Sequence, residues 1–453
     1  MEEIKNPTLL LKALIQLPST SENAHGQEAA VANVTALLEK YCGAHVNLIE
    51  TNGKPIITAT IAGEKQAAYL FYGHYDVMTP GDLDAWHSDP FTLTERHNRF
   101  YGRGTGDNKG QLIAMITGIN HYLISHPQPP FTIKFLIEGE EEQGSPNLAP
   151  TVSQLKTTFL KDVVRVFVTD GSMNASGAHV LRLGNRGLFG FRLTVTTADH
   201  ANHSGNAGNV IENPYAVLHQ ILSQLYDFDR QKNLIPHFYD GVVSPTAQEQ
   251  EWLAALPFDD TKISAVFGSQ LTASSQRDYY QKLMFTPTFN ISGIYGGHTG
   301  KDVKTIVPPR ITVTIDMRLV GSQSVQEIET NLATVLKPYV TKGVLKYEIT
   351  GRIPPSKTTP SPVDLEAFHL AAKKANVPLV IEPMMPGTDP NYVWTNILGV
   401  KVFTVPLANF DQNNHDVDEN ITKNAFQTSI QFITQLISEF EKEGSAYGLN
   451  AHN

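Results

Sequence analysis

The stretch Tyr101-Gly102-Arg103-Gly104-Thr105-Gly106-Asp107-Asn108-Lys109-Gly110 places four glycines around one aspartate and leads into an apolar helical pattern over residues 111–123. Glycine adopts backbone angles that other residues avoid, so this loop can wrap closely around a bound group. The phosphate-loop pattern needs Lys followed by Ser or Thr, and the dinucleotide fingerprint needs a third glycine that this chain lacks. We therefore interpret Asp107 as an acid that bridges two metal ions at the start of a helix. The alternative is a plain turn residue or helix cap.

The size and composition of the chain are those of a globular enzyme with two domains. Its 453 residues exceed the length at which a single hydrophobic core keeps growing. The net charge of −10 argues against a general nucleic-acid or anionic-membrane surface. The one cysteine, Cys42, cannot form an internal disulfide, and no apolar run approaches the ~20 residues of a membrane span. We expect a cytoplasmic enzyme that binds neither nucleic acid nor membrane.

Acidic or histidine residues follow four predicted buried strands, at the point where each strand ends. Helical patterns alternate with these strands, which predicts an α/β fold whose central sheet has helices on both faces. Ligands of such sheets bind beyond the carboxyl ends of the strands, so these side chains should converge there. The strands and the residues after them are 67–72 with His74 and Asp76, 131–137 with the acidic run 138–142, 163–169 with Asp170, and 400–406 with a polar loop that carries His415.

The middle of the chain predicts a second, inserted domain. Residues 191–196 and 310–319 alternate polar and apolar side chains, as half-exposed antiparallel strands do, and helical patterns cover residues 214–226 and 325–339. The sheet pattern resumes after the proline-rich segment 354–362, which we interpret as the return linker. We leave residues 229–284 unassigned. The expected division is a catalytic domain of residues 1–185 and 354–453, with an α+β domain of residues 186–353 inserted between them.

The run Glu138-Gly139-Glu140-Glu141-Glu142 places four carboxylates within five residues, directly after an apolar strand. Such runs are usually solvated loops. In a shared crevice the charges would repel one another unless cations compensated them. One glutamate can then bind a metal while its neighbour serves as general base. Similarly, Asp76 can support the ring of His74 from behind a metal site.

Taken together, the candidate ligands offer nitrogen and oxygen atoms without sulfur. This set suits Zn²⁺, Mn²⁺ or Co²⁺ better than a thiolate structural site. Each residue alone is more often a turn residue, a strand-end histidine or a surface histidine, so the prediction depends on the glycine loop around Asp107 and on the position of the other residues after apolar strands. The candidate ligands are His74, Asp107, Glu142, Asp170 and His415.

Three segments of the chain together resemble a known family. Gly-His-Tyr-Asp-Val at residues 73–77, the glycine loop 101–110 and Glu-Gly-Glu-Glu-Glu-Gln-Gly-Ser at residues 138–145 are similar to the signature of the dinuclear zinc metallopeptidases. That family includes carnosinase-type dipeptidases, glutamate carboxypeptidase, aminoacylase, acetylornithine deacetylase and succinyl-diaminopimelate desuccinylase. The resemblance implies a zinc-exopeptidase-like catalytic domain with a mixed sheet, and a ferredoxin-like lid through which a homodimer forms.

The resemblance also implies roles for individual residues and a cis peptide bond between Asp107 and Asn108. Two divalent ions, most simply Zn²⁺ and otherwise Mn²⁺ or Co²⁺, would share Asp107 as a bridge. The implied assignments are His74, Asp107 and Asp170 on one metal; Asp107, Glu142 and His415 on the other; Glu141 as the base; and Asp76 as the support of His74.

In the expected lid, Asn202-His203-Ser204-Gly205 resembles the segment whose histidine reaches the active site of the partner subunit. Arg318 resembles the arginine that clamps the terminal carboxylate of the substrate, a task that suits a guanidinium fork; an ordinary strand arginine is the alternative. Carnosinase-type members have Gly-Gly-Ser where this chain has residues 386–392, so a carnosinase-like specificity is in doubt. Gly387 and Thr388 could still donate hydrogen bonds to a carboxylate.

These features predict metal-dependent hydrolysis of an amide bond next to a free carboxylate. We expect a dipeptidase or a short-peptide carboxypeptidase. The alternatives are an N-acyl-amino-acid deacylase, a dinuclear phosphoesterase and a non-catalytic binding protein on the same scaffold. The substrate is accordingly expected to be a dipeptide or an N-acyl amino acid.

Overall fold

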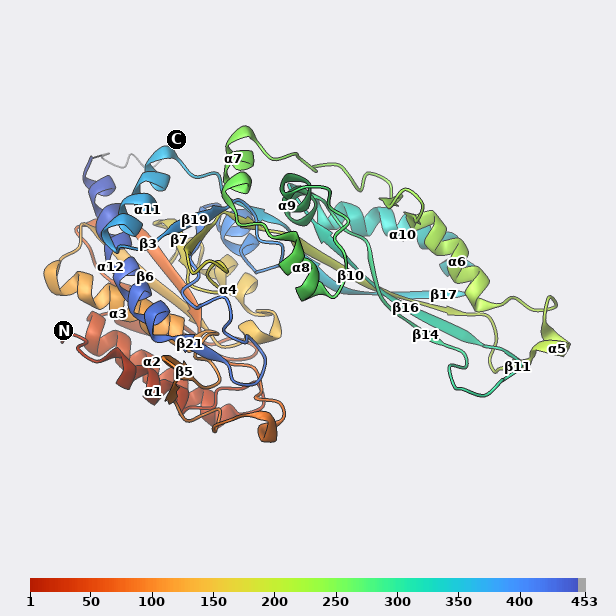
Figure 1. Ribbon diagram of the computed structural model, residues 1–453, viewed down its shortest axis with the longest axis horizontal. Coiled ribbons are helices and arrows are strands. Elements are labelled where there is room, and N and C mark those ends of the chain that lie inside the picture. Colours follow the sequence, from red (N-terminus) through yellow and green to blue (C-terminus); the bar gives the residue numbers. More distant parts are fainter. Residues whose placement is uncertain (447–453) are drawn as a thin grey trace.

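The computed structural model describes residues 1–446, with side chains to residue 442, and shows two lobes joined at one end (Figure 1). The larger lobe is built on an eight-stranded sheet in which parallel and antiparallel pairs are mixed. The resemblance implied such a mixed central sheet, and the structure confirms it. In spatial order the strands are β1 (His45–Ile49), β2 (Ile56–Ile61), β6 (Phe131–Glu138), β3 (Lys65–His74), β7 (Val163–Val168), β20 (Lys401–Thr404), β8 (His179–Arg182) and β19 (Leu379–Glu382).

Helices cover both faces of this sheet because its central strands are apolar on both sides. Successive side chains of a strand point to opposite faces. In β3, Tyr69 and Phe71 accordingly join one hydrophobic cluster, whereas Leu70 and Tyr72 join another. The first cluster lies under α1 (Pro7–Ile15), α2 (Ala24–Cys42), α3 (Lys109–Ser125), α11 (Pro362–Lys374) and α12 (Lys423–Ala446); the second lies under α4 (Leu148–Leu155) and the short helix Val393–Leu398.

The topology gathers the predicted polar residues at one edge of the sheet. Strands β6, β3, β7 and β20 are consecutive neighbours, and the pairs β6–β3, β3–β7 and β7–β20 are all parallel. Their carboxyl ends therefore lie side by side. β3 ends at His74 and β6 at Glu138, while Asp170 follows β7 by two residues.

The smaller lobe contains an antiparallel sheet with its own hydrophobic cluster. The sheet order is β14 (Asn290–Gly296), β16 (Arg310–Leu319), β10 (Gly187–Thr196) and β17 (Leu345–Ile353). Apolar side chains of this sheet pack against α6 (Pro214–Leu225) and α10 (Val325–Thr341). The chain enters after β9 (Gly184–Asn185) and returns through β18 (Ser356–Lys357), and these two short strands pair with each other. The predicted boundaries at 185/186 and 353/354 stay a prediction.

Residues 229–284, which the sequence left unassigned, contain three helices, α7 (Ala247–Ala255), α8 (Asp260–Phe267) and α9 (Gln276–Phe285). Leu253 of α7 and Phe285 of α9 pack against Met384, at the end of edge strand β19. The N-terminus of α7 is well marked, because Thr246 and Glu249 form a capping box. Its middle has no clear apolar stripe, which is why helical periodicity did not reveal it.

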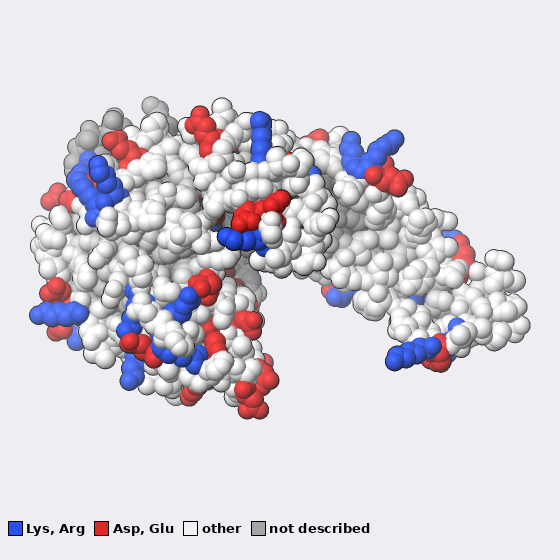
Figure 2. All heavy atoms as spheres, in the orientation of Figure 1, with Lys and Arg blue, Asp and Glu red and all other residues white. Residues whose placement is uncertain are grey.

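The surface carries acidic and basic side chains that are interspersed on the face shown in Figure 2, with a deep notch between the two lobes. Within residues 1–446, none of the helices combines the length and the apolar character that crossing a membrane requires.

Candidate metal centre and active site

The first candidate cluster joins the ends of two neighbouring strands to the glycine loop. His74 is the last residue of β3, Asp170 lies just beyond β7, and Asp107 lies two residues before α3. The Nε2 atom of His74 is 2.9 Å from Oδ1 of Asp107 and 3.6 Å from Oδ2 of Asp170. His74 is fully buried, so these contacts are shielded from water.

The second candidate cluster uses the other oxygen of the same aspartate. The Nε2 atom of His415 is 3.3 Å from Oδ2 of Asp107 and 2.9 Å from Oε2 of Glu142. Glu142 belongs to the short helix Glu141–Gln143 after β6, and His415 lies in the loop between β20 and β21 (Asn420–Thr422). Asp107 thus faces both clusters, one oxygen to each.

Both clusters have the spacing of metal sites. In each, ligand atoms from one histidine and two carboxylates lie within 4.8 Å of one another. Ligands ~2.0–2.1 Å from a tetrahedral Zn²⁺ are about 3.3 Å apart, and the measured separations are 2.9, 3.3 and 3.6 Å. The donor set of nitrogen and oxygen also fits divalent ions of this kind.

The electrostatics of both clusters favour added positive charge. Burial raises the pKa of Asp170 to about 8, and the charge of Asp107 adds to this effect. Hydrogen bonds with Asp107 and Glu142 raise the pKa of His415 to about 10. Burial opposes the ionisation of Asp170, and the carboxylates of Asp107 and Glu142 favour the cationic form of His415, so added positive charge would stabilise both clusters.

Two carboxylates of the acidic run turn away from the clusters. The Oε1 atom of Glu138 accepts hydrogen bonds from the hydroxyls of Tyr72 (2.5 Å) and Ser145 (2.8 Å). The Oε2 atom of Glu140 accepts one from the side-chain amide of Asn147 (2.5 Å). These contacts fix the turn after β6 and leave Glu141 and Glu142 to face the clusters.

Asp76 orients both of these glutamates and the ring of His74. Its two carboxylate oxygens accept the backbone N–H groups of Glu141 (3.3 Å) and Glu142 (3.1 Å). The same side chain lies 3.2 Å from Nδ1 of His74. Glu142 contacts His415, whereas within residues 1–446 the carboxylate of Glu141 receives no hydrogen bond. Burial raises the pKa of Glu141 well above its ordinary value.

The glycine loop is held by a residue that the sequence analysis did not identify, Glu419. Its Oε2 atom accepts hydrogen bonds from Nη1 of Arg103 (2.7 Å) and the N–H of Gly104 (3.0 Å). Its Oε1 atom accepts the N–H groups of Gly106 and Asp107, both at 2.8 Å. Glu419 is fully buried. No local pattern signals this role, because its partners lie more than 300 residues earlier in the chain.

The glycines of this loop permit its close path. Gly104 has a φ of +89°, a region that side chains rarely adopt. A Cβ atom at Gly110 would lie 1.9 Å from the carbonyl oxygen of Thr105, where backbone cannot move aside. The peptide bond between Asp107 and Asn108 is cis, as the resemblance implied.

Comparison with known proteins agrees with this geometry. The family described as Peptidase family M20/M25/M40 matches residues 70–439, a segment that includes both clusters and Glu419. The chain belongs to this peptidase family. As a member of the M20/M25/M40 family with two metal-binding clusters, it is a metal-dependent peptidase.

Three similar proteins illustrate the range of this family. The chain is 28% identical over 386 residues to the Beta-Ala-His dipeptidase of Homo sapiens, covering 82% of this chain and 74% of that protein. It superposes on the M20 family metallo-carboxypeptidase Sso-CP2 from Sulfolobus solfataricus with a TM-score of 0.86 and 27% identity, covering 97% and 100% of the two chains. It is 32% identical over 169 residues to the succinyl-diaminopimelate desuccinylase of Methylococcus capsulatus, covering 36% of this chain and 44% of that protein.

In this M20/M25/M40 peptidase the smaller lobe brings Arg318 to the loop that precedes the short helix Val393–Leu398. Arg318 lies on β16, and its Nη1 atom donates a hydrogen bond to Oγ1 of Thr388 (2.5 Å). Its backbone N–H donates one to Oγ1 of Thr288 (2.9 Å). Gly387 is half-buried beside Thr388. The structure thus places Arg318 in contact with Thr388, next to Gly387 in the chain, and the role of these residues as a carboxylate clamp stays a prediction.

The structure does not bring His203 of the same chain to the metal clusters. His203 is exposed and belongs to β11 (Asn202–His203), which lies at the far tip of the smaller lobe of the peptidase (Figure 1). Its Nε2 atom is 3.2 Å from Oγ1 of Thr305, and its Nδ1 atom accepts the N–H of Gly205 (3.1 Å). His200, three residues earlier, is also exposed.

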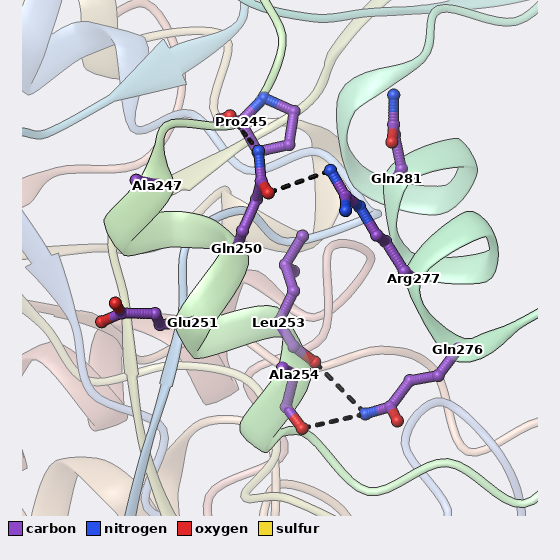
Figure 3. A pocket seen from close by; sticks show the side chains of 9 residues that line it. All are labelled: Pro245, Ala247, Gln250, Glu251, Leu253, Ala254, Gln276, Arg277 and Gln281. Carbon is purple, nitrogen blue, oxygen red and sulfur yellow. Dashed lines mark hydrogen bonds between the residues drawn. The ribbon is translucent and has the colours of Figure 1, made fainter.

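A hollow of about 370 Å³ lies between α7 and α9 (Figure 3), away from the metal clusters. Its amide side chains are largely occupied: Oε1 of Gln250 accepts a hydrogen bond from Arg277 (2.9 Å), and Gln276 donates to the carbonyl of Ala254 (3.2 Å). None of the candidate metal ligands lines this hollow, and we assign it no role in the peptidase reaction.

Proposed function

We propose that this peptidase hydrolyses dipeptides or short peptides at the peptide bond next to a free C-terminal carboxylate. It would use two divalent metal ions, Zn²⁺ first and otherwise Mn²⁺ or Co²⁺. The observation that carries the proposal is the position of Asp107 between two clusters, beside a carboxylate, Glu141, that neither cluster uses. The names of the relatives support it, because one is a dipeptidase and another a metallo-carboxypeptidase.

The residues of the chain would divide the reaction among themselves. When bound, the two metal ions lower the pKa of a water molecule toward neutrality and polarise the substrate carbonyl. Glu141 accepts a proton from this water and later delivers it to the leaving amine. A carboxylate that belongs to neither metal cluster and accepts no hydrogen bond is suited to this proton transfer. Arg318 and Thr388, with the backbone of Gly387, hold the terminal carboxylate and so fix the peptide bond at the clusters.

We also propose that the enzyme is a homodimer, in a cytoplasmic location that the single buried Cys42 suits. The partner subunit's His203 would donate a hydrogen bond to the carbonyl oxygen as negative charge develops there. Its exposure at the tip of the smaller lobe supports this role, because a residue placed there can reach a second copy but not its own clusters.

An N-acyl-amino-acid deacylase is the second candidate. It is favoured by the partial match to a desuccinylase and by the absence of Gly-Gly-Ser at residues 386–392. Both candidates require the same metals and the same carboxylate clamp. They differ only in the acyl group on the carbonyl side of the broken bond, which is an amino-acid residue in a dipeptide and a group such as acetyl or succinyl in an N-acyl amino acid.

A substrate panel separates the two candidates. We expect neutral dipeptides such as Ala-Ala and Ala-Leu to be hydrolysed faster than N-acetyl-alanine and N-succinyl-alanine. A chelator should abolish the hydrolysis, and add-back of Zn²⁺, Mn²⁺ or Co²⁺ should restore it. Faster release of acetate or succinate would select the deacylase, and hydrolysis that survives complete metal removal would refute both.

A further inference from the structure

Arg186 is a buried cation at the junction of the two lobes. It lies between β9 and β10 and is only 8% exposed. Its Nε atom donates a hydrogen bond to the carbonyl of Pro386 (2.7 Å), and its backbone N–H donates one to the carbonyl of Met385 (3.2 Å). Arg186 therefore lies against the same loop that Arg318 contacts through Thr388.

The two side chains contact the same loop two residues apart, at Pro386 and Thr388, and neither has an acidic partner among the described residues. Burial lowers the pKa of Arg186 to about 10, and the positive charge of Arg318 adds to this effect. Within residues 1–446, no carboxylate forms an ion pair with either side chain. Burying a charge without a partner is strongly unfavourable, and a second charge of the same sign beside it increases the cost. Such a pair is suited to bind anions.

Asp389, on the same loop, does not compensate these charges. The cation that acts on its carboxylate is Arg182, and Asp389 in turn contributes to the raised pKa of Asp170 in the first metal cluster. The loop is therefore divided. Asp389 interacts electrostatically with the carboxylates of the metal clusters, whereas Pro386 and Thr388 contact the two arginines.

We propose that Arg186 and Arg318 together bind two carboxylates, so that the preferred substrate is a dipeptide that ends in Asp or Glu. This inference rests on the proposed function, in which Arg318 and Thr388 hold the terminal carboxylate. Arg186 holds the side-chain carboxylate of the same residue. The terminal carboxylate neutralises one guanidinium group, and the second guanidinium group requires a second carboxylate.

The test compares Ala-Glu with Ala-Gln, which has the same shape without the charge. We expect the metal-loaded wild-type enzyme to have a kcat/KM for Ala-Glu about tenfold to a hundredfold above that for Ala-Gln, mainly through a lower KM. The reason is that a guanidinium group forms stronger hydrogen bonds to a carboxylate than to a neutral amide. In Arg186→Gln this preference should fall to near unity, while metal content and Ala-Gln hydrolysis persist. The matched control is Arg192→Gln on β10, which removes a half-exposed arginine paired with Glu348 and should leave the preference unchanged.

The outcomes separate this inference from the proposed function. Equal hydrolysis of Ala-Glu and Ala-Gln by the wild-type enzyme, or an equal loss of both in Arg186→Gln, overturns the second carboxylate site and leaves the dipeptidase intact. If neither dipeptide is hydrolysed with metal present, the proposed function fails. Should Arg186→Gln not fold, inhibition of the wild-type enzyme decides: free glutamate should inhibit Ala-Ala hydrolysis at least about tenfold more strongly than glutamine, and equal inhibition overturns the inference.

Discussion

The metal-binding half and the substrate-binding half of the candidate site are assembled in opposite ways. His74, Asp107 and Glu142 meet within one chain, where adjacent strands of a rigid sheet end and Asp76 and Glu419 hold them from behind. Arg318 and His203 instead belong to the smaller lobe, and His203 is exposed at its far tip. Metal binding and turnover should therefore be separable by mutation. Changes on the lobe should spare the metals.

The largest effect is expected for Glu141→Ala. If Glu141 moves the proton but binds no metal, hydrolysis should fall by a factor approaching ~10⁴, while the variant retains two metal ions per chain. Metal analysis of the purified variant beside a dipeptide assay checks both parts. Glu142→Ala is the matched neighbour and should lose metal. The reverse pattern would mean that the roles of the two glutamates are exchanged.

His203→Ala should have the next largest effect. Loss of a donor to the developing oxyanion costs on the order of 10²–10³ in rate, and the metal content should not change because His203 lies outside both clusters. Turnover at the wild-type rate would contradict its assignment.

A mixing experiment tests whether His203 acts across a dimer. Coexpressed Glu141→Ala and His203→Ala chains should form hybrid dimers in which one of the two sites has both residues intact. Activity well above that of either variant alone is expected. If activity does not rise although the chains mix, His203 does not act in trans.

The candidate metal ligands could be proposed from the sequence because His74, Glu142, Asp170 and His415 follow apolar strands, and parallel strands bring such positions together. Asp107 was proposed from the glycine loop instead, and the binding of metal by all five stays a prediction. The helix at residues 111–123 was also correctly predicted from its apolar periodicity, and the strand at residues 131–137 from its apolar run. The helices of residues 229–284 were missed, because α7 is specified by its cap more than by an apolar stripe. Glu419 could not be predicted, since a buried carboxylate that binds backbone N–H groups far away in the chain leaves no local pattern.

Glu419→Gln should have the smallest effect on turnover, and it tests how the metal-binding half is held. A glutamine oxygen can still accept the N–H groups of Gly106 and Asp107, but its NH₂ group then faces two donors, Arg103 and the N–H of Gly104. Leaving a buried arginine without its carboxylate costs about 3 kcal/mol of stability, so the unfolding midpoint should fall. Because the loop carries Asp107, metal affinity should weaken by ~10–100-fold, whereas kcat at saturating metal should change little.

Glu95→Gln, which removes only an exposed pair with Lys423, is the control. Metal affinity equal to that of the wild type would show that the glycine loop positions Asp107 without this carboxylate, and the support of the metal-binding half would then have to come from the sheet and Asp76 alone.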